Sequence, residues 1–202
     1  MKEKKNKNHI KGDQLICKIF TPPFQEKVMK RLEILVQEHS NENQERQRIT
    51  YQRIYPLIGA VQVKMEEGLS KEEAIKEVQE AFYENYVYPS LKSLKRFFSI
   101  PLLYKFFIPL SIKLVRKRLK VEIGFLYNIS QEEKNESRYD IIKCPYHEIC
   151  CDYGLPEMTD IFCTSDDIIY TSVHNNIVFE RSKTIGRGDD ICDFHFYRKD
   201  VY

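Results

Sequence analysis

The sequence predicts an α+β protein, with a helical N-terminal half packed on a mostly antiparallel β-sheet in the C-terminal half. Two patterns lead to this prediction. Apolar residues recur at helical spacing through residues 21–120, whereas segments rich in β-branched and aromatic residues begin at residue 121. The 42% apolar composition of the 202 residues supplies enough material for a core and excludes global disorder.

The first part of the chain is predicted to begin with a flexible basic tail over residues 1–20, followed by a helical region over residues 21–120. The first helix is expected to start at the proline pair of residues 22–23, and the second follows the apolar face of residues 48–65.

Two more helical segments are expected before residue 120. Ser70 and Glu73 have the spacing of a capping box, so a helix should begin there and end near Tyr88, before Pro89. Another helix, or a broken pair of helices, should cover residues 91–119.

Residues 121–202 are predicted as a cysteine-rich α+β region that forms one integrated domain with residues 21–120. A helix should begin at Leu155 and run to about Ile169. In the last strand, Cys192, Phe194 and Phe196 should share one face. The expected strands cover residues 121–129, 139–144, 176–184 and 191–197, with a loop at 130–137 and a turn at 186–189.

Charge is divided unevenly along the chain. Residues 1–121 carry 24 basic and 14 acidic side chains, a net charge of +10, and residues 122–202 carry 8 and 16, a net charge of −8. This split argues against a uniformly basic nucleic-acid binder, so no nucleic-acid partner is expected. The basic N-terminus is not followed by an apolar segment, so no secretory signal is expected and a cytoplasmic location is predicted.

One apolar segment, residues 97–115, is interrupted by two lysines and two prolines and is not expected to span a membrane. From Lys92 to Lys120 there are nine basic residues and no acidic ones. Such a segment could make weak contact with an anionic membrane surface. The alternative is a buried helix pair with its cationic face in solvent. No oligomeric state is predicted.

Five of the six cysteines lie within residues 144–192. In a reducing compartment this clustering favours chemistry or metal binding over disulfides. Residues 144–151 read CPYHEICC, which brings Cys144, His147, Cys150 and Cys151 together. Thiolates and imidazole are ligands for zinc or iron, but the spacing is not that of a regular zinc finger. No cofactor is predicted, and a thiolate-bound zinc or iron is the alternative.

Two further groups could carry chemistry. On a helix, Asp160, Cys163 and Asp167 share a face, and Asp166 is also within reach of Cys163; packing in the core is the alternative for this cysteine. Farther along, either of two arginines could hold a substrate carboxylate, and the alternative is that both lie on the surface. These arginines, with the threonine between them, are Arg181, Thr184 and Arg187.

Taken in order, these motifs resemble the L-2-amino-thiazoline-4-carboxylic acid hydrolase family. The resemblance covers residues 120–202, and the helical first half agrees in layout. The motifs are Cys144-Pro145-Tyr146, Gly154-Leu155-Pro156-Glu157, Phe162-Cys163 with Asp166, Arg181 with Thr184-Ile185 and Gly188, and Cys192-Asp193-Phe194 with Phe196.

The resemblance implies a hydrolase of the type that acts on carbon–nitrogen bonds other than peptide bonds, with a small-molecule substrate. A cyclic isothiourea bearing a carboxylate would be opened to an N-carbamoyl amino acid. In this reading Cys163 or Cys144 is the nucleophile, Cys192 belongs to the catalytic group and Asp166 is the general base. Arg181, Thr184 and His147 would bind the substrate. The alternative is a non-catalytic module that binds a small molecule or a metal.

Overall fold

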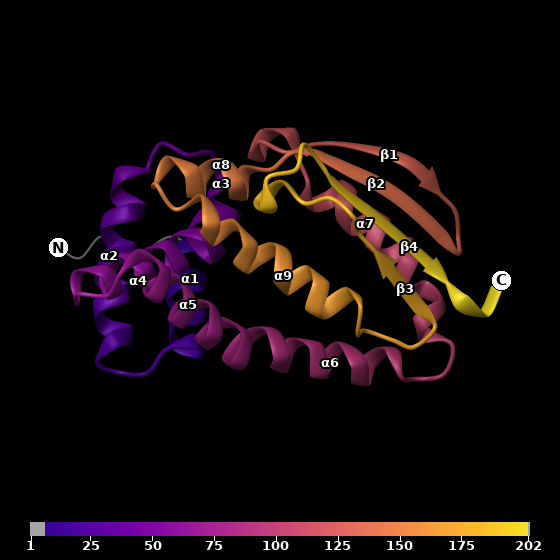
Figure 1. Cartoon of the computed structure of the whole chain (residues 1–202), viewed down its shortest axis with the longest axis horizontal. Coiled ribbons are helices and arrows are strands. Elements are labelled where there is room, and N and C mark those ends of the chain that lie inside the picture. The colour runs from indigo at the N-terminus through magenta and orange to yellow at the C-terminus, as the bar shows by residue number, and fades with distance from the viewer. Residues whose placement is uncertain (1–6, 202) are drawn as a thin grey trace. The chain divides into compact units, whose positions relative to one another are not determined.

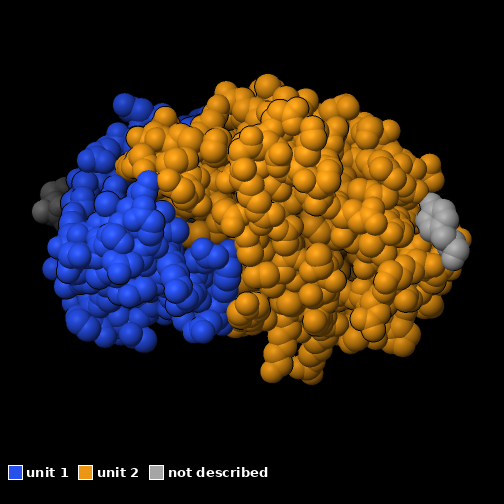
Figure 2. Space-filling model, in the orientation of Figure 1, with its two compact units in different colours: residues 1–86 blue, residues 87–202 orange. Residues whose placement is uncertain are grey.

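Helices fill the first part of the chain, and an antiparallel sheet with its covering helices fills the rest, so the predicted α+β class is confirmed (Figure 1). The computed structural model describes residues 7–201. Contacts within the chain define two units, residues 1–86 and residues 87–202 (Figure 2). This boundary differs from the predicted change of character at residue 120, because the last helices before the sheet belong with the sheet.

The first unit is helical, and its core is built around α4. This helix has apolar residues on all sides, and Leu57, Ile58, Ala60 and Val61 are fully buried. Contacts with α2 and α5 cover it, as expected for a helix without a polar face. The elements are α1 (Lys7–Ile19), α2 (Phe24–Glu38), α3 (Gln44–Ile49), a π-helical turn (Thr50–Ile54), α4 (Tyr55–Glu66) and α5 (Lys71–Phe82).

Helix α1 replaces most of the flexible tail predicted over residues 1–20; residues 1–6 lie outside the described residues. Leu15, Ile16 and Ile19 are buried on one face, which ties the segment to the core. At Gly12 the helix approaches the backbone of Tyr51 so closely that an added Cβ atom would lie 2.2 Å from its carbonyl oxygen. The many basic residues of this segment led to the prediction of a tail, although its apolar residues lie on one helical face.

Helix α5 begins as predicted, and its end differs from the prediction. Ser70 and Glu73 form the complete capping box. The chain then continues through a π-helical turn (Tyr83–Val87) into α6 (Tyr88–Phe98), with Pro89 in the first turn of α6. The predicted end before Pro89 is wrong, because a proline in the first turn of a helix removes only an N–H group that has no intrahelical acceptor.

The second unit holds the sheet and the helices that cover it. Besides α6, its elements are 3-10 turns at Leu103–Phe106, Val121–Ile123, Pro156–Met158, Ile185–Arg187 and Lys199–Val201, helices α7 (Phe107–Arg118), α8 (Pro145–Asp152) and α9 (Thr159–Tyr170), and strands β1 (Leu126–Glu132), β2 (Glu136–Lys143), β3 (Ile177–Glu180) and β4 (Cys192–Arg198). Residues 130–137, predicted as a loop, mostly extend the β1–β2 hairpin. The strand predicted from residue 121 begins later, because Gly124 has a positive φ of 110°.

Within residues 7–201, four strands form one antiparallel sheet in the order β1-β2-β4-β3. Alternate residues of β4 are buried, so Cys192, Phe194 and Phe196 lie on the inner face as predicted. The ring of Phe196 contacts Phe107 of α7 at 5.7 Å and Tyr170 of α9 at 5.2 Å between centroids. Both helices therefore cover the same face of the sheet, and α9 runs beside β3 (Figure 1).

No single helix among residues 7–201 has the length and apolar character needed to cross a membrane. The bent pair formed by Lys71–Phe98 and Leu103–Arg118 does pass the same test of length and composition.

Candidate functional site

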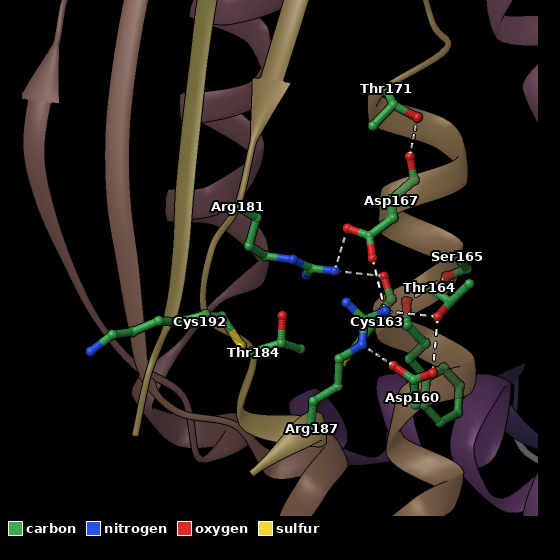
Figure 3. A network of polar contacts seen from close by, with 12 residues as sticks. Asp160, Cys163, Thr164, Ser165, Asp167, Thr171, Arg181, Thr184, Arg187 and Cys192 are labelled. Atoms are coloured by element: carbon green, nitrogen blue, oxygen red, sulfur yellow. Dashed lines mark hydrogen bonds and ion pairs between the residues drawn. The ribbon is translucent and has the colours of Figure 1, made fainter. Parts of the chain in front are cut away.

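The candidate site lies where α9 faces the loop that joins β3 to β4 (Figure 3). Helix α9 carries Cys163 and Asp167, and β4 begins with Cys192. The joining loop spans residues 181–191 and is called the β3–β4 loop below. It contributes Arg181, which lies directly after β3.

Two carboxylates on the C-terminal side of the β3–β4 loop fix the backbone at its N-terminal side. One carboxylate oxygen of Asp193 accepts the backbone N–H groups of Ser182 at 2.9 Å and Lys183 at 2.5 Å. Burial raises the pKa of Asp193, but the hydrogen bonds from Ser182 and Lys183 outweigh it and the net pKa is lowered. Asp189 accepts the N–H of Thr184 at 2.7 Å, which closes the turn around Gly188.

The closed turn covers the sulfur of Cys163. A Cβ atom added at Gly186 would lie 2.9 Å from Cys163 Sγ and 2.9 Å from Thr159 Cγ2. The sulfur of Cys192, the first residue of β4, accepts a hydrogen bond from the backbone N–H of Ile185 at 3.2 Å. Both Cys163 and Cys192 are buried. Glycine is required at position 186 by close approach, since its φ is not positive.

Replacing Gly186 by alanine should lower the free energy of unfolding by about 1–3 kcal/mol, because the new methyl group overpacks the contact with Cys163. Combining it with Cys163→Ala should cost less than the sum of the two single changes, as measured by urea unfolding in a double-mutant cycle. The exposed Cys151 is the matched control: a cycle with Cys151→Ala should be additive. Additivity with Cys163→Ala as well would contradict the close approach.

Arg181 is the most deeply buried cation of the site, with 2% of its side chain exposed. One terminal nitrogen donates to the carbonyl oxygen of Cys163 at 2.9 Å and to Asp167 at 2.5 Å. The guanidinium carbon lies 5.7 Å and 5.1 Å from the ring centroids of Phe179 and Phe194, at cation–π distance. Its buried Nε has no hydrogen-bond partner within residues 7–201. The structure thus excludes a surface arginine and leaves a buried donor unused.

Arg187 ties the β3–β4 loop to α9 from the solvent side (Figure 3). It donates to Asp160 at 2.6 Å, and through another nitrogen to Thr164 and Asp167, each at 2.9 Å. Asp167 therefore pairs with both arginines through different oxygens. The prediction that Asp160 and Asp167 share the face of α9 that carries Cys163 agrees with these contacts.

Burial raises the pKa of all three predicted thiols. The pKa of Cys144 rises to about 12, and burial is the largest cause, while the backbone N–H groups of His147 and Tyr146 act in the opposite direction. The pKa values of Cys163 and Cys192 are also raised, first by burial. Each of the three is further affected by the charge of Asp166, and Cys163 by both other thiols. The predicted catalytic residues thus lie within electrostatic range of one another.

The neutral thiols should make the protein less stable at alkaline pH. Thiols of the unfolded chain lose their protons near pH ~8.5, whereas the raised pKa values keep them protonated in the fold. Their contribution is fully present below that pH and is lost as the pH rises toward the folded-state values. Urea unfolding between pH 8 and 10 should show the decline, and Cys144→Ala should reduce its slope. An unchanged slope in Cys144→Ala would contradict this account.

The side chain of His147 does not join this group. Its ring lies 3.2 Å from the hydroxyl of Thr159 through Nδ1 and 3.5 Å from Cys151 through Nε2. Thr159 in turn packs under Gly186, so His147 reaches the β3–β4 loop only through an intermediate residue. Thr184 is buried in the loop, and its described hydrogen bonds use its backbone.

Tyr139 and Tyr170 also face this site and were not predicted from the sequence. Tyr139 lies on the inner face of β2, stacked on Phe194 at 4.8 Å between ring centroids. Its pKa is raised well above the ordinary value, first by burial and then by the charges of Tyr170 and Asp166. The alternation of Tyr139 and Ile141 with polar residues along β2 is the sequence signal that could have placed Tyr139 on the inner face, where it pairs with Phe194.

No group of three or more His, Cys, Asp or Glu side chains within residues 7–201 is arranged to hold a metal ion. The three cysteines of the CPYHEICC segment lie in different surroundings: Cys150 is buried, Cys151 is exposed beside the ring of His147, and Cys144 lies before α8. The zinc or iron alternative stays a prediction.

Comparison with known proteins gives one match. The model of a family described as L-2-amino-thiazoline-4-carboxylic acid hydrolase matches residues 46–196. The matched range includes every residue of the site described above. No curated protein and no solved structure matches the chain.

Proposed function

Because the chain belongs to the L-2-amino-thiazoline-4-carboxylic acid hydrolase family, we propose that it hydrolyses a cyclic isothiourea or amidine that bears a carboxylate. The family match covers 46–196 and so includes the β3–β4 loop and α9. L-2-amino-thiazoline-4-carboxylate is the substrate that we would test first, with an N-carbamoyl amino acid as the product.

The observation that carries this proposal is the buried Arg181 beside the thiols of Cys163 and Cys192. A guanidinium with an unpartnered Nε–H in an apolar surrounding is suited to bind a carboxylate oxygen through a charge-assisted hydrogen bond. The carbonyl of Cys163 and Asp167 both use one terminal nitrogen of Arg181. The Nε–H is therefore the donor of Arg181 that we assign to the substrate carboxylate.

In the proposed reaction, the Cys163 thiolate attacks the ring carbon between sulfur and nitrogen. A carbon–sulfur bond to Cys163 forms, the bond from that carbon to the ring sulfur breaks, and Cys192 gives its proton to the departing sulfur. Asp166 then passes the proton that it took from Cys163 to Cys192, which restores both groups. Water adds to the same carbon, Asp166 takes its proton, and Cys163 leaves and recovers that proton from Asp166. One water is consumed, and the product carries a ureido group and a new thiol.

The raised pKa values of the thiols support different roles for Cys192 and Cys163. A thiol that stays protonated is a suitable acid for the departing sulfur, which fits Cys192. The attacking thiol must lose its proton when substrate binds, and Asp166 is the nearby base that we assign to this step. Cys144 is the second candidate for the nucleophile. Thr184 and His147 stay predicted substrate contacts.

The test is the release of new thiol from L-2-amino-thiazoline-4-carboxylate by the purified full chain. Thiol accumulating far beyond the six protein cysteines is the expected result. Cys163→Ala should lower kcat by at least about 10³-fold, and Asp166→Asn by about 10²–10⁴-fold. Cys151→Ala, at an exposed thiol, is the matched control and should keep full activity. Full turnover by Cys163→Ala would remove this residue as the nucleophile.

One observation favours a second function, a binding module without turnover. Burial leaves all three thiols protonated, so none is activated in the unliganded site. Heat of binding measured by calorimetry without any thiol release would support that function and would contradict the hydrolase.

A further inference from the structure

The connection between α6 and α7 exposes an unusual number of large apolar side chains. This segment, residues 97–110, is called the α6–α7 tip below. Large apolar residues exposed together mark interaction sites more often than chance exposure does. The exposed apolar side chains of the tip are Phe97, Ile100, Leu102, Phe106 and Leu110.

The tip is packed on the core of its unit although its outer side chains are exposed. Phe98 and Phe107 are buried, with ring centroids 5.3 Å apart in an edge-to-face contact. Ile108 is fully buried as well. Phe107 in turn contacts Phe196 of β4, so these residues join the tip to the sheet.

The backbone conformation of Leu102 is further evidence that the α6–α7 tip is a functional surface. Its φ is 69°, in the left-handed region that is unfavourable for a branched side chain. The side chain is 58% exposed, so burial does not compensate for the conformation. Unfavourable backbone conformations of this kind concentrate at functional sites.

Within the segment that contains the tip, every charged residue is basic, although Asp200 accepts the hydroxyl of Tyr104 and Glu132 pairs with Arg116. The segment Lys92–Lys120 contains nine basic residues and no acidic one. Lys92, Lys95 and Arg96 are exposed on α6, and Lys113 and Lys117 are exposed on α7. From Phe106, which directly precedes α7, the spacing of residues 106, 110, 113 and 117 follows one helical face, so the exposed stripe passes from apolar to basic.

We propose that the α6–α7 tip docks on an anionic lipid bilayer. The apolar side chains enter the boundary between headgroups and acyl chains, and the lysines that flank the tip contact lipid phosphates. Lysine stems can lie along the apolar boundary while their ammonium groups reach the phosphates. An acidic protein would satisfy the lysines, but it would not by itself give the exposed apolar side chains a place out of water.

The experiment is cosedimentation of the full chain with vesicles of phosphatidylglycerol and phosphatidylcholine, against vesicles of phosphatidylcholine alone. Binding should require the anionic lipid and weaken with added salt. The double variant Lys92→Glu/Lys117→Glu should bind at least about 25-fold more weakly, since each lost lysine near the surface lowers the partition coefficient about fivefold. Lys11→Glu/Lys76→Glu changes the net charge equally at exposed sites of the other unit and should bind normally.

Leu102→Asn separates a lipid contact from a structural role. Asparagine tolerates the left-handed conformation, so the variant should unfold at the same or a higher urea concentration while losing vesicle binding. Equal binding to both vesicle types, or equal losses in the two double variants, would overturn the proposal. So would no vesicle binding together with binding to polyglutamate, which would assign the tip to an acidic protein.

Discussion

Arg181→Met should lower kcat/KM for the proposed substrate by at least about 10²-fold, because it removes both the carboxylate clamp and its charge. It should also lower the free energy of unfolding by about 2–3 kcal/mol. The loss is smaller than for a fully isolated buried pair, since Asp167 keeps Arg187 and is partly exposed. Arg181→Lys should restore part of the stability and little of the activity, because an ammonium can hold Asp167 but offers no second donor at the position of Nε.

The matched control is Arg138→Met, on the outer face of β2, where the side chain is exposed. It should change the free energy of unfolding by no more than about 0.5 kcal/mol and leave kcat/KM unaltered. If Arg181→Lys retained full activity with an unchanged KM, the assignment of Arg181 to the substrate carboxylate would be wrong. Its structural contribution would still be measured by the unfolding experiment.

Phe196→Ala should lower the free energy of unfolding by about 3–5 kcal/mol, enough to leave the second unit barely folded. Its ring is fully buried between Phe179 of β3, at 4.8 Å between centroids, and the rings of α7 and α9. Removing it leaves a cavity where the sheet meets both covering helices. Chemical denaturation followed by circular dichroism measures the change.

The same substitution at Phe106 provides the control, because that ring is 62% exposed at the α6–α7 tip. Without vesicles, Phe106→Ala should change stability by less than about 0.5 kcal/mol. A loss of less than about 1 kcal/mol in Phe196→Ala would show that the inner face of the sheet is not the core of its unit.

Much of the fold could be predicted because its signals are local. The capping box at Ser70 depends on two side chains three residues apart, and the alternation in β4 repeats every second residue. The wrong predictions arise where one local sequence pattern is compatible with two different structures. Pro89 is compatible both with the end of one helix and with the first turn of the next. In α1 the many polar residues hide the apolar face, and this face stabilises a helix only because it contacts the core.

The candidate site could be predicted only in part. The shared face of Asp160, Cys163 and Asp167 followed from helical spacing alone. The burial of Arg181 could not be predicted, because it depends on aromatic rings contributed by β3 and β4. The need for glycine at position 186 likewise arises from a contact with α9 that lies more than twenty residues away in sequence.

The close approach of Gly186 to Cys163 also sets how fast this sulfur can be chemically labelled. A reagent reaches the sulfur only while the β3–β4 loop is displaced, so the labelling rate equals the intrinsic thiol rate multiplied by the fraction of time spent displaced. The exposed Cys151 in the same unit supplies an internal reference for the reagent. The labelling rate of Cys163 therefore measures how often the β3–β4 loop opens. It also measures how strongly the ion pairs of Arg187 with α9 resist that opening.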